Sequence, residues 1–121
     1  MAWKIWSIAG LVLACAIGNC GAWAQDAKTI SGVAAFYSAD YKGPTASGES
    51  YDPRKYTCAH RSFPFGTRLR VTDPKSRRSV VVTVNDRGPF TKGRVIDLSL
   101  AAAKELRMIG HGLMKVTAAL Q

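Results

Sequence analysis

Three side chains that can give or take a proton stand in segments rich in turn-forming residues. They are Glu49, His60 and Asp86, in a sequence of 121 residues with only eight acids and two histidines. Acidic groups and a histidine at rigid turns indicate a built site rather than a solvated surface. Two carboxyl groups near a histidine are typical of sites that cleave glycosidic bonds, where one carboxyl group protonates the leaving oxygen and a carboxylate assists.

Each of the three also has a purely structural interpretation. Glu49 can be a solvated loop residue, and His60 can be a structural histidine with satisfied hydrogen bonds. Asp86 can cap the turn over residues 85–88, as Asp often does. The sequence alone leaves these interpretations open beside the catalytic one.

Four further side chains are candidates for contact with substrate or for support of the site. Asp52 precedes a proline, so it either forms a turn or assists the acids. Tyr37 either stacks on a sugar ring or belongs to the core. Arg87 either pairs within its own loop or binds a carboxylate of the substrate. Asp97 either hydrogen-bonds near a helix start or within the sheet, or supports the site.

The first 24 residues have the pattern of a secretory signal peptide. A short basic start and the apolar run 5–17 are followed by small residues at Ala22 and Ala24. The run is too short for a good membrane-spanning helix. We expect cleavage after Ala24, which leaves residues 25–121 as an exported protein of the periplasm, the cell envelope or the exterior. In the alternative, the chain is processed as a lipoprotein with a lipid anchor at Cys15.

The charge of the chain restricts the kinds of molecule that it is expected to bind. The chain carries 17 Lys and Arg residues against eight Asp and Glu residues, a net charge of +9. A positive surface attracts anionic polymers. Export, and the lack of an Arg-rich helix or an aromatic stacking repeat, argue against nucleic acid. An anionic cell wall or membrane surface fits the charge better.

Cys58 is the one cysteine left after the signal peptide, so no internal disulfide is expected. A free cysteine usually behaves as a small buried residue. The alternative is a thiol nucleophile activated by His60. Two histidines and one thiol at these spacings do not make a ligand cluster, so we expect no metal and no cofactor.

The apolar patterns predict one small, mainly β domain over residues 31–121, after a polar lead-in at residues 25–30. A long loop at residues 40–53 is of the kind that usually carries function. Ser99 is the expected N-cap of a helix over residues 100–108, which Gly110 ends. Strands are predicted from Ser31 and over residues 67–72, 79–84, 94–98 and 113–118, the second and third joined as a hairpin. A barrel with a helical insertion accommodates this order.

Five stretches of the sequence, in this order, match a known family: residues 32–37, 45–52, 58–60, 80–90 and 94–99. From about Ser31 to Leu120 the chain resembles the rare lipoprotein A (RlpA-like) family of double-psi β-barrel domains. The resemblance implies a six-stranded barrel with one short helix. It also implies an endolytic lytic transglycosylase that cleaves the β-1,4 bond between MurNAc and GlcNAc of peptidoglycan to 1,6-anhydro products, with a preference for naked glycan strands.

The functional acids and the histidine of that family fall on Glu49, Asp52, Asp86 and His60. We hypothesise that Glu49 is the general acid and base, and that Asp86 favours its protonated form or stabilises charge on the sugar. His60 then positions the substrate or steers the carboxyl group. Exchange of the roles of Glu49 and Asp86 is an equal alternative. Related expansin barrels use an acid at the position of Asp97.

Two departures from the family pattern limit the resemblance. Many members carry a C-terminal glycan-binding SPOR repeat, which residues 31–121 do not include, so recruitment to the division site by that route is not expected. Position 58 is often alanine in the family. The alternative function is an expansin-like module that binds or loosens wall polysaccharide without cutting it, and a small secreted inhibitor module comes third. We expect a monomer.

Overall fold

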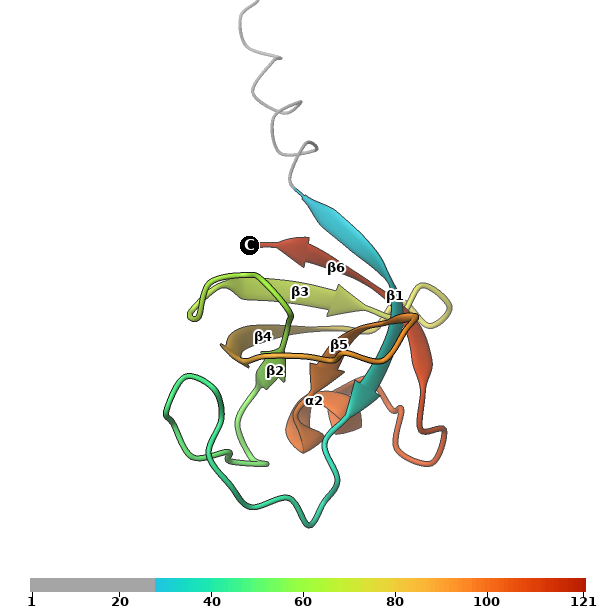
Figure 1. Ribbon diagram of the computed structural model, residues 1–121. Helices are drawn as coiled ribbons and strands as arrows, with labels where there is room; N and C mark the ends of the chain where they lie inside the picture. The colour runs from blue at the N-terminus through green and yellow to red at the C-terminus, as the bar shows by residue number, and fades with distance from the viewer. Residues whose placement is uncertain (1–27) are drawn as a thin grey trace, which may run out of the picture.

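The computed structural model describes residues 28–121, so the predicted signal peptide and the alternative anchor at Cys15 lie outside the described residues. Six strands form a closed barrel, and one short helix packs against it (Figure 1). This confirms the predicted mainly β barrel. The elements are β1 (Thr29–Phe36), β2 (Thr57–Ala59), β3 (Arg68–Thr72), β4 (Ser79–Asp86), β5 (Arg94–Leu98), α2 (Leu100–Glu105) and β6 (Met114–Leu120).

The strands follow one another around the barrel in the order β1-β5-β2-β4-β3-β6, and pairing of β6 with β1 closes it. Strands β1 and β5 run parallel, as do β2 and β4, whereas the other neighbours are antiparallel. The predicted hairpin is present as β3 and β4. Strand β2 is only three residues long, and the apolar patterns did not predict it.

The core is filled by alternate residues of the strands, because a strand points successive side chains to opposite faces. In β4, Val80, Val82 and Val84 are buried, while Thr83 is only partly covered. Cys58 of β2 lies fully buried in the same core, which confirms its interpretation as a small buried residue. Within residues 28–121, no helix is long and apolar enough to cross a membrane.

A β-bulge at the end of β4 interrupts the alternation of buried residues just before Asp86. Val84 and Asp86 occupy successive pairing positions opposite β2, so Asn85 is the extra residue. Such bulges re-aim the side chains that follow them. Asp86 is therefore in register with Ala59 of β2, and Ala59 is paired on its other side with Asp97 of β5. One row across three neighbouring strands holds both acids.

Helix α2 begins where the sequence predicts. The side chain of Ser99 accepts a hydrogen bond from the backbone N–H of Ala102 at 3.3 Å, which is N-capping. The same hydroxyl donates to the carbonyl of Lys55 at 2.6 Å and accepts from the N–H of Thr57 at 3.2 Å. Ser99 therefore fixes the helix start to the chain that enters β2.

The helix ends earlier than predicted. The expected span of residues 100–108 with Gly110 as terminator is wrong, since α2 ends at Glu105. Arg107 adopts a φ of 58°, and the N–H of Met108 bonds back to a helix carbonyl at 3.0 Å. This is the Schellman motif, in which the left-handed position is usually glycine. Here an arginine occupies it, so the glycine-based rule placed the end too late.

Candidate functional site

The long loop between β1 and β2 is fastened to the end of β4. The backbone N–H of Ser47 donates to the carbonyl of Asn85 at 3.2 Å. Asp86, which follows Asn85 in β4, also holds the loop, because its Oδ1 accepts from the N–H of Ala46 at 2.7 Å. The side-chain amide of Asn85 donates to Oε1 of Glu49 at 3.2 Å. These bonds bring Glu49 and Asp86 to the same short stretch of loop.

The carboxylate of Asp86 accepts three hydrogen bonds. Its Oδ1 accepts from the N–H of Ala46 and, at 2.9 Å, from the N–H of Arg87. Its Oδ2 accepts from the hydroxyl of Tyr37. An ionised carboxylate can accept all three. Burial, followed by the contact with Asp86, raises the pKa of Tyr37, so this hydroxyl keeps its proton and remains a donor.

Glu49 is held less completely than Asp86. Its Oε1 accepts from the amide of Asn85 and from the hydroxyl of Ser47 at 3.3 Å. Its side chain is exposed and lies on the wall of a hollow of about 730 Å³, which Asn85, Thr57 and Thr83 also line. Glu49 is therefore a carboxyl group in a defined orientation at the edge of a space large enough for a ligand.

His60 lies beside Asp86 and has one ring nitrogen committed to the local turn. The backbone N–H of His60 donates to the carbonyl of Asp86 at 3.2 Å. Its Nδ1 accepts from the N–H groups of Ser62 at 3.1 Å and Phe63 at 3.0 Å. The neutral ring that accepts at Nδ1 carries its proton on Nε2. If His60 contacts substrate, it does so as an N–H donor.

The surroundings of His60 favour its neutral form. The imidazole is buried and stacks on the ring of Phe63 with centroids 4.0 Å apart. Burial lowers the pKa of His60, and the positive charges of Arg61 and Arg87 lower it further. A structural role for His60 is therefore present, and it is compatible with a role in positioning substrate.

Arg87 supports the segment after β2. Its Nη1 donates to the carbonyls of His60 at 3.1 Å and Phe63 at 2.8 Å. Its guanidinium carbon lies 4.1 Å from the centre of the ring of Phe65. The predicted pairing within its own loop is thus not what the structure shows, because the guanidinium reaches a different loop.

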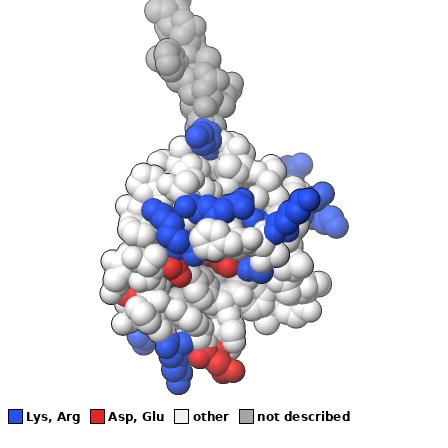
Figure 2. Space-filling view, viewed as in Figure 1, with Lys and Arg blue, Asp and Glu red and all other residues white. Residues whose placement is uncertain are grey.

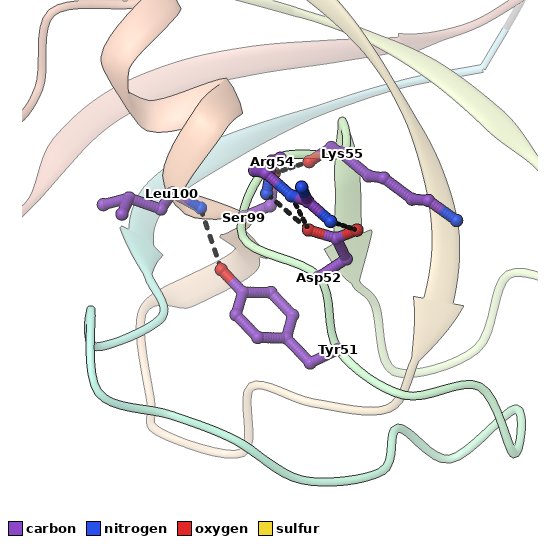
Figure 3. Close-up of polar contacts among 6 residues, drawn as sticks. All are labelled: Tyr51, Asp52, Arg54, Lys55, Ser99 and Leu100. Carbon is purple, nitrogen blue, oxygen red and sulfur yellow. Dashed lines mark hydrogen bonds and ion pairs between the residues drawn. The ribbon is translucent and has the colours of Figure 1, made fainter.

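Three tyrosines form a cluster beside Asp86. Tyr37 and Tyr51 stack with centroids 4.5 Å apart, and Tyr41 packs against both at 5.4 and 5.5 Å. The hydroxyl of Tyr51 accepts from the N–H of Leu100 at 3.0 Å (Figure 3). The cluster thereby fixes the β1–β2 loop to the start of α2 and holds Tyr37 in place.

Asp52 forms a local turn, as one of its two interpretations predicted. Its Oδ1 accepts from the backbone N–H of Arg54 at 2.9 Å, and an ion pair with the guanidinium of Arg54 has a distance of 3.1 Å (Figure 3). Hydrogen bonds from Arg54 lower the pKa of Asp52. Asp52 also lines the hollow that Glu49 borders, so it is available to a bound ligand.

Asp97 is paired within its own strand. Oδ1 of Asp97 accepts from Arg94 at 2.6 Å, which is the predicted bonding within the sheet rather than at the helix start. The charge of Asp97 also contributes to the raised pKa of Tyr37, so it lies near the Tyr37–Asp86 pair.

Cys58 does not belong to this site. Its side chain is fully buried, and burial raises the pKa of the thiol. Among the described residues, no group of three or more His, Cys, Asp or Glu side chains is arranged to hold a metal ion.

Sequence reasoning missed the residues that join these parts. Asn85 links Glu49 to β4 and Tyr51 links the loop to the helix, while Ser99 was predicted as the N-cap but not as the link from α2 to β2. Asn85 directly precedes Asp86 in the sequence, and this adjacency to a candidate acid was the one feature that could have indicated its role. The partners of Ser99 and Tyr51 lie more than 40 residues away, so no local pattern reveals them.

Known proteins place this barrel in a family. A family model described as lytic transglycolase matches residues 29–118. The chain belongs to this family. This confirms the resemblance to RlpA-like double-psi β-barrel domains.

Several curated relatives of this lytic transglycolase domain are named for peptidoglycan. One from Nostoc sp., named "Probable endolytic peptidoglycan transglycosylase RlpA", is 56% identical over 91 residues, which cover 73% of this chain and 24% of the relative. The "Endolytic peptidoglycan transglycosylase RlpA" of Pasteurella multocida is 48% identical over 83 residues, which cover 68% of this chain and 28% of the relative. The chain thus spans about a quarter of the length of these relatives.

Solved structures share the fold. The Streptomyces papain inhibitor superimposes with a TM-score of 0.64 at 23% identity, covering 77% of this chain and 94% of the inhibitor. An expansin of Clavibacter michiganensis superimposes with a TM-score of 0.60 at 25% identity, covering 78% of this chain and 50% of the expansin. The likeness to the inhibitor shows the fold alone.

Proposed function

We propose that this chain is an endolytic peptidoglycan lytic transglycosylase that cleaves the β-1,4 bond between MurNAc and GlcNAc and leaves 1,6-anhydro ends. The observation that carries the proposal is the fastening of Glu49 and Asp86 to one stretch of loop through Asn85 and Ala46. Membership of the lytic transglycolase family and the names of the relatives support it. The substrate is outside the cytoplasm, in agreement with the predicted signal peptide.

Glu49 acts in this proposal as acid and then as base. Its carboxyl group donates a proton to the glycosidic oxygen, and the bond from that oxygen to C1 of MurNAc breaks. The resulting carboxylate takes the proton of the C6 hydroxyl of the same MurNAc, and O6 bonds to C1. No water is consumed, and the residue ends in its original protonation state. The position of Glu49 on the wall of the hollow gives a bound glycan access to its carboxyl group.

Asp86 acts as a fixed negative charge. Donors from Tyr37, Ala46 and Arg87 occupy its oxygens, so it is a poor candidate for repeated proton transfer. A charge held in position before the reaction stabilises the positive sugar ring of the transition state without reorganisation. His60 contributes an N–H donor from Nε2, and Asp52 and Asp97 border or support the site.

The roles of Glu49 and Asp86 are tested on residues 25–121, which contain the whole described barrel. The protein is incubated with sacculi, with and without prior removal of stem peptides by an amidase, and soluble products are identified by mass spectrometry. We expect anhydro-ended fragments, more from the naked strands, and their loss in Glu49→Gln. Full activity in Glu49→Gln together with loss in Asp86→Asn would exchange the two roles.

A second candidate is an expansin-like module that binds or loosens wall polysaccharide without cutting it. The likeness to the expansin of Clavibacter michiganensis favours this candidate. The same experiment separates the two functions. If the protein pellets with sacculi and releases no anhydro-ended fragment from either substrate, the transglycosylase proposal is wrong and the binding function replaces it.

A further inference from the structure

A second surface lies at the other end of β4 from the candidate site. Strand β4 begins at Ser79, directly after the turn at residues 73–78, and ends at Asp86. Its eight residues span about 23 Å at roughly 3.3 Å per step. Figure 1 accordingly places this turn and the loop between β1 and β2 on opposite sides of the barrel. The surface is independent of the proposed catalytic residues.

Two segments distant in sequence make up this surface. The turn at residues 73–78 and the connection from α2 to β6 together border a hollow of about 370 Å³, with Lys75 on one side and Lys115 on the other. A neighbouring hollow of about 450 Å³ is bordered by Arg78 together with Lys104 and Arg107. We call these five cations the basic end.

Two carboxylates, those of Asp73 and Glu105, balance only part of the charge of the five cations of the basic end. Asp73 borders the first hollow, but its residue is buried and its carboxylate accepts bonds from the N–H of Lys75 at 3.0 Å and the hydroxyl of Ser76 at 2.8 Å. Glu105 borders the second hollow and accepts from the hydroxyl of Tyr56 at 3.4 Å. Figure 2 shows Lys and Arg side chains projecting on the flank where the β3–β4 turn lies.

Two large aliphatic side chains project from the same surface. Ile109 is 45% exposed and Leu113 is 57% exposed, and both belong to the connection between α2 and β6. Leu113 lines the first hollow between Lys75 and Lys115. Exposed aliphatic groups among cations are the composition with which proteins bind the interface of anionic bilayers: the cations meet headgroups and the aliphatic groups enter the acyl boundary. A soluble anionic polymer would leave the aliphatic side chains of Ile109 and Leu113 exposed to water.

We infer that the basic end docks on the surface of a membrane containing anionic phospholipids. Docking there leaves the opposite end of β4, with Glu49 and Asp86, directed away from the bilayer. The inference goes beyond the proposed function and does not depend on it, since binding to lipid requires no catalysis.

The test is co-sedimentation of residues 25–121 with sucrose-loaded vesicles. Vesicles of phosphatidylglycerol and phosphatidylcholine are compared with vesicles of phosphatidylcholine alone. We expect binding only to the anionic vesicles, weakening steeply with added salt because exposed charges are screened. The double variant Lys104→Glu/Arg107→Glu should lose roughly tenfold or more in partition coefficient. Ile109→Ser/Leu113→Ser should lose roughly tenfold at unchanged charge.

The matched control is Lys28→Glu/Lys42→Glu, which changes the net charge equally at exposed positions outside the basic end. It should retain most of the binding. The inference is overturned if this control loses as much binding as the double variant at Lys104 and Arg107. It is also overturned if the wild-type protein does not bind the anionic vesicles, or if soluble polyphosphate competes fully and the serine variants bind like wild type. That last result would identify a polymer site.

Discussion

Tyr37 donates its hydroxyl hydrogen to Oδ2 of Asp86, although 49 positions separate the two residues in the chain. Tyr37 follows β1 and Asp86 ends β4, so the bond joins two strands that are not neighbours in the barrel. The stack of Tyr37 on Tyr51 fixes the direction of the hydroxyl. Asp86 is thereby held in one orientation at the end of β4.

Replacement of Tyr37 by Phe should lower kcat of the proposed reaction roughly 10- to 100-fold, with a smaller change in KM, because a donor that holds the charged group is lost. The ring stack is retained, so the thermal midpoint should hardly change. Release of anhydro-ended fragments measures the rate. Tyr41→Phe is the control, because within residues 28–121 the hydroxyl of Tyr41 bonds the carbonyl of Pro44 and not Asp86. Equal kcat in Tyr37→Phe and wild type would contradict the role of this bond.

His60 should make the stability depend on pH. Its pKa is lowered in the folded state from the ordinary value of 6.5, so the unfolded chain binds the proton more readily. The stability due to the neutral ring is fully present above about pH 6.5. It is lost as the pH falls from there through the lowered folded pKa. Urea unfolding between pH 7.5 and 5 measures this.

In the variant His60→Asn this step should disappear, while the side-chain oxygen still accepts from Ser62 and Phe63. His60→Ala removes the acceptor as well and should cost about 1–2 kcal/mol at pH 7.5. Parallel stability curves for wild type and His60→Asn over this range would show that His60 is not the titrating group.

Ser99→Ala should destabilise the barrel by about 2–3 kcal/mol, because the fully buried hydroxyl caps α2 and also bonds Lys55 and Thr57. Urea unfolding monitored by circular dichroism gives the free energy of unfolding. Ser62→Ala, at an exposed position, should change it by less than about 0.5 kcal/mol. A similarly small effect of Ser99→Ala would mean that water replaces the hydroxyl.

Cys58 should be inert to thiol reagents in the folded protein. It is fully buried and its pKa is raised, so the reactive thiolate is scarce and inaccessible. In residues 25–121 it is the single thiol, so labelling with a chromogenic disulfide reports it alone. We expect labelling in 6 M guanidinium chloride and almost none in buffer. Fast labelling in buffer would reopen the thiol-nucleophile hypothesis.

Local patterns predicted the long elements well and the short ones poorly. The mostly apolar run over residues 80–84 indicated β4, and β5 has the predicted bounds. Strand β2 has three residues and no apolar run, so only the family resemblance implied a sixth strand. The end of α2 was misplaced because Arg107 takes a conformation that the glycine rule assigns elsewhere.

The candidate site was predicted as a set of residues but not as an arrangement. Glu49 and Asp86 were chosen by residue type and by their turns. Their common attachment depends on Asn85 and on backbone groups such as the N–H of Ala46, which every residue except proline possesses. The residue types in the sequence therefore could not reveal this common attachment.

The closure of the barrel by β6 against β1 has a consequence for the time at which the protein can fold. Strand β1 is the first element of the described chain and β6 the last, and β6 also completes the edge of β3. Pairing of such distant segments is slow compared with local pairing. Until residues 114–120 have been synthesised, β1 and β3 each lack a neighbour. The barrel can therefore close only after nearly all of the described chain has been synthesised.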